Sequence, residues 1–175
     1  ATRLALFLWC SVPDAELLKL AGSGELGNSK VMEVQIRRML DDPRSERLSK
    51  HFVRQWLDMQ LLDFLDIKQH VGGFDPLLKE AMQHEPVAMF HEVLRHDASV
   101  LDFIHADYTM VNERLAMHYG LPGVHGNHFR RVKLDASQRR GGLLTQAGLL
   151  AMNSDGTDSH PLKRGIWLLE SFLND

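Results

Sequence analysis

The sequence predicts an all-α fold, a single orthogonal bundle of about eight helices with little or no strand near residues 124–134. Three observations predict this fold class. Apolar residues recur at helical spacing along most of the chain, residues that favour helix starts precede these runs, and glycine or proline follows them. The chain has 175 residues, a length that suits one domain with a substantial core. We therefore expect residues 1–175 to form one helical domain.

The N-terminal part of the chain predicts three short helices. The first lies in the apolar run over residues 3–9. Pro13 suits the first position of a second helix, which Gly22 ends. Asn28 suits the cap of a third helix, which has to end before Pro43 because proline interrupts helical hydrogen bonding.

Two Asp-Pro pairs predict the starts of the two longest helices. The pair at residues 42–43 precedes an apolar pattern that continues to Leu62, and the pair at residues 75–76 precedes one that continues to Leu94. Pro86 lies inside the second pattern and removes one backbone donor, so we expect a kink or a break there.

Three further helical segments are predicted after the second long helix. Ser99 suits the cap of a short helical turn, and Thr109 suits the cap of a helix that Gly120 ends. The periodicity then lapses, which indicates a loop or a short ribbon. Helical spacing returns over residues 143–152, and Pro161 starts a last helix. The apolar residues expected in this last helix are Trp167, Leu168, Phe172 and Leu173.

Composition narrows the classes of function. Twenty Lys and Arg residues stand against 23 Asp and Glu residues, with the two signs interspersed, so no basic surface for nucleic acid is expected. Apolar runs such as residues 4–10 are far shorter than the roughly 20 residues that span a bilayer, so no membrane span is expected. Cys10 is the one cysteine, which excludes an internal disulfide and a cysteine-based zinc cluster.

Two apparent cofactor motifs fail on their context. Residues 22–27 match the letters of the dinucleotide fingerprint, but a helix precedes them, so their glycines indicate a helix stop and a turn. His91 and His96 are one residue too far apart to share a helix face as zincin ligands do. His84 could share a face with His91 and Glu80, but solvated helix histidines are the favoured interpretation.

A polar loop before the last helix supplies the candidate binding residues. Its composition is similar to that of a calcium loop, but it lacks the EF-hand spacing and the terminal Glu. Asp158, Ser159 and His160 are adjacent in sequence and match no nucleophile-elbow pattern, so hydrolysis is unsupported and capping of the next helix is favoured. The candidate ligand-binding residues are Asn153, Asp155, Asp158, His160 and Arg164.

Two other residue groups have structural interpretations. The basic clusters at residues 139–142 and 163–165 could receive an anion, but pairing with nearby acids is favoured. Four aromatic residues lie in apolar stripes, where core packing is the expected role. They are Trp9, Trp56, Phe90 and Trp167.

Residues 107–120 carry a resemblance to a known family. Their sequence, DYTMVNERLAMHYG, resembles a signature of planctomycete-type multidomain proteins associated with cytochrome c. Further segments resemble the same family in the same order. They are residues 3–9, 37–40, 55–57, 140–145 and 160–167.

The resemblance implies a larger protein around this chain. Members of that family look like extracytoplasmic chains, in the periplasm or at the cell surface, in which domains of unknown function accompany a haem-binding cytochrome c module. Residues 139–175 would then begin an adjoining family domain. A signal peptide and a haem-attachment motif would lie outside these residues, and with one cysteine this segment cannot attach c-type haem itself. We expect no cofactor here, with haem c elsewhere in the full-length chain.

Two hypotheses about function follow, and the sequence does not decide whether the chain is an enzyme. In the first, the chain is a noncatalytic interaction or scaffold module whose partners are neighbouring domains of the same protein, including a cytochrome c module. In the alternative, the loop over residues 152–164 forms part of a redox enzyme or of a ligand-binding site.

Overall fold

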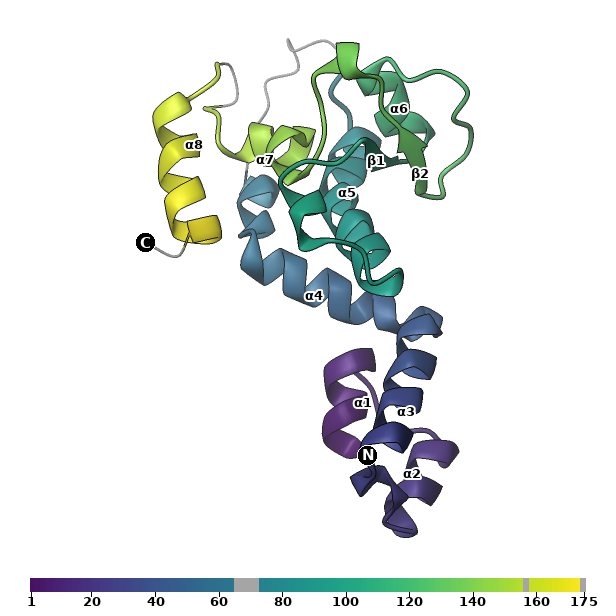
Figure 1. Cartoon of the computed structure of the whole chain (residues 1–175). Helices are drawn as coiled ribbons and strands as arrows, with labels where there is room; N and C mark the ends of the chain where they lie inside the picture. Colours follow the sequence, from purple (N-terminus) through teal and green to yellow (C-terminus); the bar gives the residue numbers. More distant parts are fainter. Residues whose placement is uncertain (65–72, 156–157, 174–175) are drawn as a thin grey trace.

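The computed structural model describes residues 1–64, 73–155 and 158–173. Within these residues it contains eight α-helices, one π-helix, several short 3₁₀ turns and one two-stranded sheet. The predicted all-α class is therefore confirmed as mostly helical, with one small antiparallel sheet in addition. Figure 1 shows a smaller N-terminal lobe, a larger lobe and helix α4 between them, with the two termini in different lobes.

The N-terminal lobe consists of α1 (Thr2–Trp9), α2 (Ala15–Gly22) and α3 (Ser29–Asp41). Asn28 caps α3 as predicted, since its side chain accepts a hydrogen bond from the backbone of Lys30. Trp9 is fully buried, and its Nε1 donates to the carbonyl oxygen of Met39, 2.9 Å away. The lobe has a hydrophobic cluster of its own, formed by Ala5, Leu8, Trp9, Leu17, Leu26 and Met39.

Helix α4 (Glu46–Trp56) starts behind the predicted Asp-Pro signal but is shorter than predicted. The prediction that the helix continues to Leu62 is wrong, because the chain turns at Asp58, which has a left-handed φ of 51°. A 3₁₀ segment, η3 (Met59–Phe64), follows the turn. Leu57, before the turn, and Leu62, within η3, are both fully buried, so the apolar pattern is real although it spans two elements.

Helix α5 (Pro76–Arg95) is the longest element and begins at the predicted cap, Asp75. Pro86 does not split it, since residues 76–95 are helical throughout. Pro86 is itself buried, with Glu85 and Val87 buried on either side. Tertiary packing on this segment therefore offsets the lost backbone hydrogen bond.

A two-stranded antiparallel sheet follows, in which β1 (Tyr108–Val111) pairs with β2 (Arg130–Lys133). The prediction that Thr109 caps a helix is wrong, because this residue lies in β1 and its hydroxyl donates to Glu85 Oε1, 2.8 Å away. Asn112 caps α6 (Glu113–Tyr119) instead. The short ribbon expected after Gly120 is confirmed at β2.

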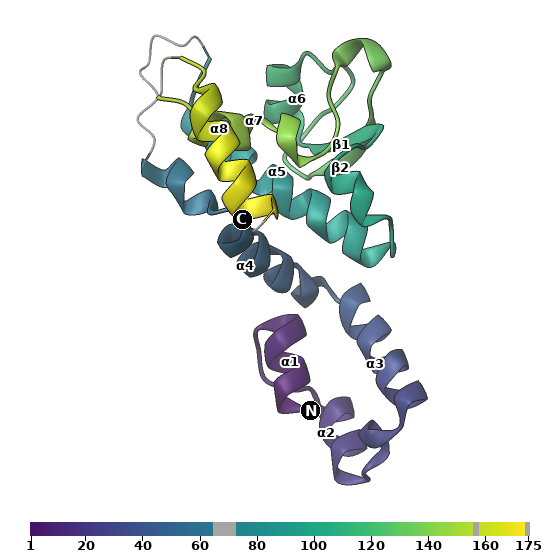
Figure 2. The same ribbon diagram turned by 60° about the vertical axis from the view of Figure 1, so that its left-hand side comes forward.

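The C-terminal part comprises the 3₁₀ turns η5 (Ala136–Gln138) and η6 (Leu143–Thr145), the helices α7 (Ala147–Met152) and α8 (Pro161–Trp167), and the π-helix η7 (Leu168–Leu173). Figure 2 shows α8 at the outside of the larger lobe. Another 3₁₀ turn, η4 (Val100–Phe103), follows α5. Among the described residues, no helix is long and apolar enough to span a membrane.

A second hydrophobic cluster joins the elements of the larger lobe. Its largest fully buried apolar side chains are Tyr108, Leu57, Leu62, Leu78, Met89, Leu115 and Leu143. Trp167 is buried in this cluster, and Trp56 and Phe90 pack against it. The predicted core role of the aromatic residues is therefore confirmed.

Candidate functional site

The predicted polar loop lies between α7 and α8, and its side chains bond to nearby backbone. Asn153 is buried, and its Nδ2 donates to the carbonyl oxygen of Leu149, 2.9 Å away. Asp155 Oδ1 accepts a hydrogen bond from the backbone nitrogen of Asp158, 2.7 Å away. Gly156, near the middle of the predicted loop, lies outside the described residues. The polar side chains of this loop therefore stabilise its backbone conformation.

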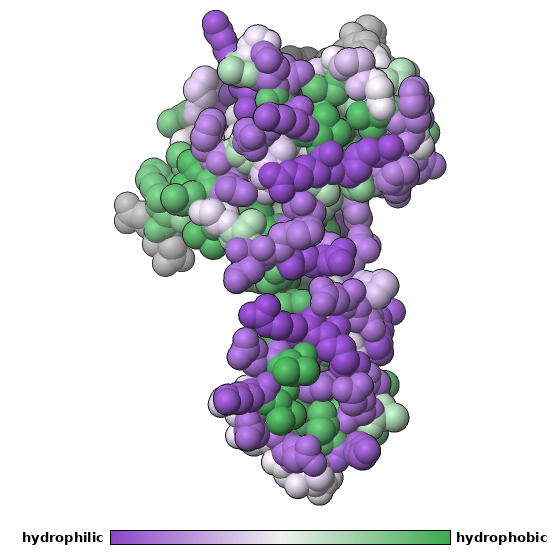
Figure 3. Space-filling view, turned by 45° about the vertical axis from the view of Figure 1, so that its right-hand side comes forward, coloured by the Kyte–Doolittle hydropathy of each residue, from purple (hydrophilic) through white to green (hydrophobic). Residues whose placement is uncertain are grey.

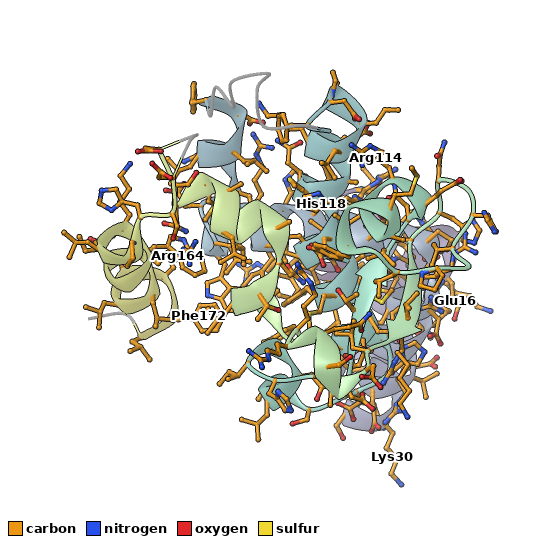
Figure 4. The ribbon with its side chains drawn as sticks, turned by 90° about the horizontal axis from the view of Figure 1, so that it is seen from above. Glu16, Lys30, Arg114, His118, Arg164 and Phe172 are labelled. Atoms are coloured by element: carbon orange, nitrogen blue, oxygen red, sulfur yellow. The ribbon has the colours of Figure 1, made fainter. Side chains whose placement is uncertain are left out.

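His160 and Arg164 belong to the start of α8. His160 Nδ1 accepts from the backbone nitrogen of Lys163 at 3.4 Å, so this side chain caps the helix. Arg164 is half-buried, and among the described residues its buried Nε has no hydrogen-bond partner. Figure 4 shows Arg164 on the side of α8 that faces the rest of the molecule. A ligand-binding role for these residues stays a prediction.

The opposite side of α8 and η7 carries an exposed apolar stripe, which we call the α8 stripe. Its members are Leu162, Ile166, Leu169 and Leu173, with exposed fractions of 69%, 47%, 45% and 63%. The inner side is anchored by two tryptophans. Trp167 Nε1 donates to Leu57 O at 3.2 Å, and Trp56 Nε1 donates to Ser171 O at 3.0 Å. The inner side is thus fixed to the core while the stripe faces outwards.

Two other elements also expose large apolar side chains. Helix α1 exposes Leu6 and Phe7, and the segment around η4 exposes Val100, Leu101 and Ile104. Figure 3 shows hydrophobic residues at the surface of both lobes, between hydrophilic ones. Clustered apolar exposure of this kind is typical of surfaces that bind other proteins.

His84 lines three cavities of about 220, 280 and 430 Å³ along α5. We call them together the His84 groove. Its polar residues are Glu46, Lys50, Arg54, Glu80, Gln83, His84, His91, Glu92, Arg95, Asn112, Arg114, Asn127 and His128. The sequence grouping of Glu80, His84 and His91 on one side of a helix therefore corresponds to a real surface.

The groove contains close polar pairs. His84 Nε2 lies 3.3 Å from Glu46 Oε1, and a hydrogen bond of 3.1 Å joins His91 Nδ1 to Ser49 Oγ. Burial lowers the pKa of both imidazoles, which favours their neutral form. Within the described residues, no three His, Cys, Asp or Glu side chains are arranged to hold a metal ion. The groove is therefore a polar depression without a formed metal site in that part of the chain.

A buried carboxyl group lies behind this surface, at Glu85. Its two oxygens accept hydrogen bonds from Thr109 Oγ1 at 2.8 Å and from the Tyr119 hydroxyl at 2.6 Å. The Tyr119 hydroxyl in turn accepts from the backbone nitrogen of Ala147, 2.8 Å away, and the guanidinium of Arg140 lies over the Tyr119 ring. Burial raises the pKa of Glu85 to about 7.

This Glu85 cluster explains several residues of the sequence signature. Thr109 and Tyr119 belong to the segment over residues 107–120, and Arg140 belongs to the matching segment after it. The glycines after Arg140 have a steric role, because a Cβ at Gly141 or Gly142 would collide with the backbone carbonyls of Ala106 and Ile104. Arg140 itself packs inside the fold, since its Nη1 donates to the carbonyl oxygen of Thr145, 3.0 Å away, and its guanidinium lies over the Tyr119 ring.

A family model described as "PSD4: Protein of unknown function (DUF1592)" matches residues 1–121. The chain belongs to this family. The PSD4 match covers helices α1 to α6, which lie in both lobes, and ends directly after α6. The α8 stripe and the polar loop lie beyond the matched range. The description assigns no activity to the PSD4 family, and no curated protein or solved structure matches the chain.

Proposed function

We propose that this chain is a helical, noncatalytic interaction module of an extracytoplasmic protein associated with cytochrome c. Its proposed partners are neighbouring domains of the same protein, with a haem c-bearing module among them, in the periplasm or at the cell surface. The resemblance of six sequence segments to planctomycete-type proteins, in family order, supports this context. Residues 139–175 would begin an adjoining domain.

The exposed apolar faces carry the proposal. The α8 stripe, the segment around η4 and the outer side of α1 expose large apolar side chains in groups. In contrast, Asn153, Asp155 and His160 are engaged with local backbone. Apolar groups on an ordered helical framework favour protein docking, because burying apolar surface is favourable. Since the helices are already ordered, little conformational entropy is lost on binding.

A ligand-binding or redox site around residues 152–164 is the second candidate. One observation favours it, namely the buried Nε of Arg164 that has no hydrogen-bond partner in the described part of the chain. Since a buried guanidinium nitrogen gains from an acceptor, an anionic ligand group could bond to it.

A titration distinguishes the two candidates. The chain is titrated by calorimetry with the remaining domains of its full-length protein, produced separately. The interaction module predicts saturable binding, and it predicts that His160→Ala and Arg164→Gln leave any turnover of the full-length protein unchanged. Absence of binding, together with loss of turnover in either folded variant, would contradict the proposal and favour the second candidate.

A further inference from the structure

The spacing of the α8 stripe is that of a helix-pairing seam. Leu162, Ile166, Leu169 and Leu173 follow one another at intervals of four, three and four residues. In an α-helix this is the spacing of the a and d positions of the heptad repeat, with Ile166 and Leu173 at a and Leu162 and Leu169 at d. The second half of the stripe lies in the more loosely wound π-helix η7, so the exposure of Leu169 and Leu173, and not the spacing alone, places them on the outer side. The exposed fractions show that this side stays outward through the π-helical turn of η7.

We propose that the α8 stripe binds the α8 stripe of a second copy of this chain, with the two helices antiparallel. The inference rests on the proposed interaction role and names the partner of one surface. A two-fold pair of this kind is closed, because the same patch serves both copies. Neighbouring domains would then dock on other faces of the chain.

The antiparallel arrangement places apolar residues opposite one another in every layer. When Leu162 lies opposite Leu173 of the second copy, Ile166 lies opposite Leu169 of the second copy. The two-fold axis repeats both contacts, which gives four apolar layers from four residues of each helix. Every member of the stripe is therefore covered by the same pairing.

Charge complementarity selects this direction. Lys163 and Glu170 are exposed and lie seven residues apart, on the same flank of the stripe. In an antiparallel pair, Lys163 of each copy faces Glu170 of the other, so two opposite-charge pairs form. In a parallel pair this flank faces the other flank of the partner helix, which carries Gly165, and the ion pairs are lost.

Gly165 gives a steric reason to expect a second helix at this surface. A Cβ at this residue would meet no atom within 4 Å in one copy, so the fold of a single copy does not require glycine there. Glycine is unfavourable within a helix, but it allows a second backbone to approach closely. Because the seam spans only residues 161–173, the interface is small, and we expect a concentration-dependent equilibrium.

Sedimentation equilibrium of the 175-residue chain, over a wide concentration range, tests the proposal. The expected result is a mass that rises from one copy towards two. Leu169→Glu should stay a single copy at every concentration, whereas the matched control Val34→Glu, at a 61% exposed position on α3, should associate as the wild type does. Unchanged circular dichroism and melting would show that both variants are folded.

A charge exchange tests the direction of the helices. K163E and E170K should each weaken association by roughly tenfold, because each turns both ion pairs into like-charge pairs. The double variant K163E/E170K should restore the wild-type constant. A single-copy mass at the highest concentration, association unaffected by Leu169→Glu, or failure of the double variant to restore it would overturn the proposal.

The sedimentation result and the calorimetric titration test self-association and domain binding separately. A chain that binds the remaining domains in the calorimetric titration but never associates with itself overturns this inference alone. A chain that associates through the stripe but does not bind those domains supports the inference and contradicts the cytochrome-associated context.

Discussion

Trp167 donates a hydrogen bond from Nε1 to the carbonyl oxygen of Leu57, which precedes it by 110 residues and lies 3.2 Å away. This contact joins α8 to the end of α4, where the chain turns at Asp58. It determines which side of α8 faces the core. The outward position of the α8 stripe is the consequence.

Replacement of Trp167 should therefore loosen the C-terminal helix. Trp167→Phe removes the indole donor and should lower the free energy of unfolding by about 1 kcal/mol, the usual net value of one hydrogen bond. Trp167→Ala should lower it by about 3 kcal/mol or more, since a cavity is added. Urea titration measures both, with Val34→Ala, at a 61% exposed position on α3 outside the α8 stripe, as the control. Equal effects of all three changes would contradict the anchoring role.

Glu85 should make the fold more stable in mild acid than at neutral pH. Its pKa rises from 4.5 to about 7 in the folded protein because burial disfavours the charged form. The unfolded chain therefore releases this proton more readily, so stability falls as the pH rises from about 4.5 to about 7 and is constant above that range. The difference corresponds to roughly 3 kcal/mol for this group.

Glu85→Gln tests this pH dependence, because the amide has nearly the same shape and keeps an acceptor oxygen. The variant should lack the fall in unfolding free energy between about pH 4.5 and about pH 7. Glu80→Gln, at an exposed position of the same helix, should keep it. Parallel pH profiles of the wild type and Glu85→Gln would show that Glu85 does not titrate in this range.

Gly148 should not tolerate a side chain. A Cβ there would lie 2.6 Å from the carbonyl oxygen of Met82, where α7 contacts α5. Gly148→Ala should cost about 1–3 kcal/mol of stability, as overpacking does. Gly22→Ala, where a Cβ would meet nothing within 4 Å, is the matched control and should be neutral or slightly stabilising. Thermal melts of the two variants give the comparison, and similar melting temperatures would refute the close contact.

The Asn112 side chain should stabilise the start of α6. Asn112→Ala removes the side-chain oxygen that accepts from the backbone nitrogen of Leu115, 3.0 Å away, and should cost about 1 kcal/mol. Asn112→Asp should retain most of the stability, since aspartate also caps helices. A chemical-denaturation series measures the ranking, and an alanine variant as stable as the aspartate variant would argue against the cap.

The helix starts could be predicted because their causes are local. Asn28 and Asp75 both cap helices at the predicted positions, since a cap needs only a side chain and a backbone donor a few residues later. The same local reasoning failed at Thr109, because the hydroxyl of this residue bonds to Glu85, 24 residues away in sequence. The pairing of β1 with β2 is likewise a non-local contact.

At the candidate surfaces, too, local features could be predicted from the sequence and non-local contacts could not. The sequence identified the turn-forming loop before α8 but had no means of showing that Asn153 is buried. Trp167 and Leu173 are both apolar residues of the predicted last helix, but the structure buries Trp167 and leaves Leu173 63% exposed. A helix that is apolar on two sides does not reveal from its own residues which side the core covers, because the tryptophan anchor comes from a distant segment.

Hydrogen–deuterium exchange shows which surfaces of this chain its neighbouring domains cover. Amide exchange is measured by mass spectrometry in the 175-residue chain and in the full-length protein that contains it. An interaction module should show slower exchange in the full-length protein at one or more of the apolar faces on α1, around η4 and along α8, with no change in the interior of α5. Identical exchange at all three faces in the two proteins would contradict it.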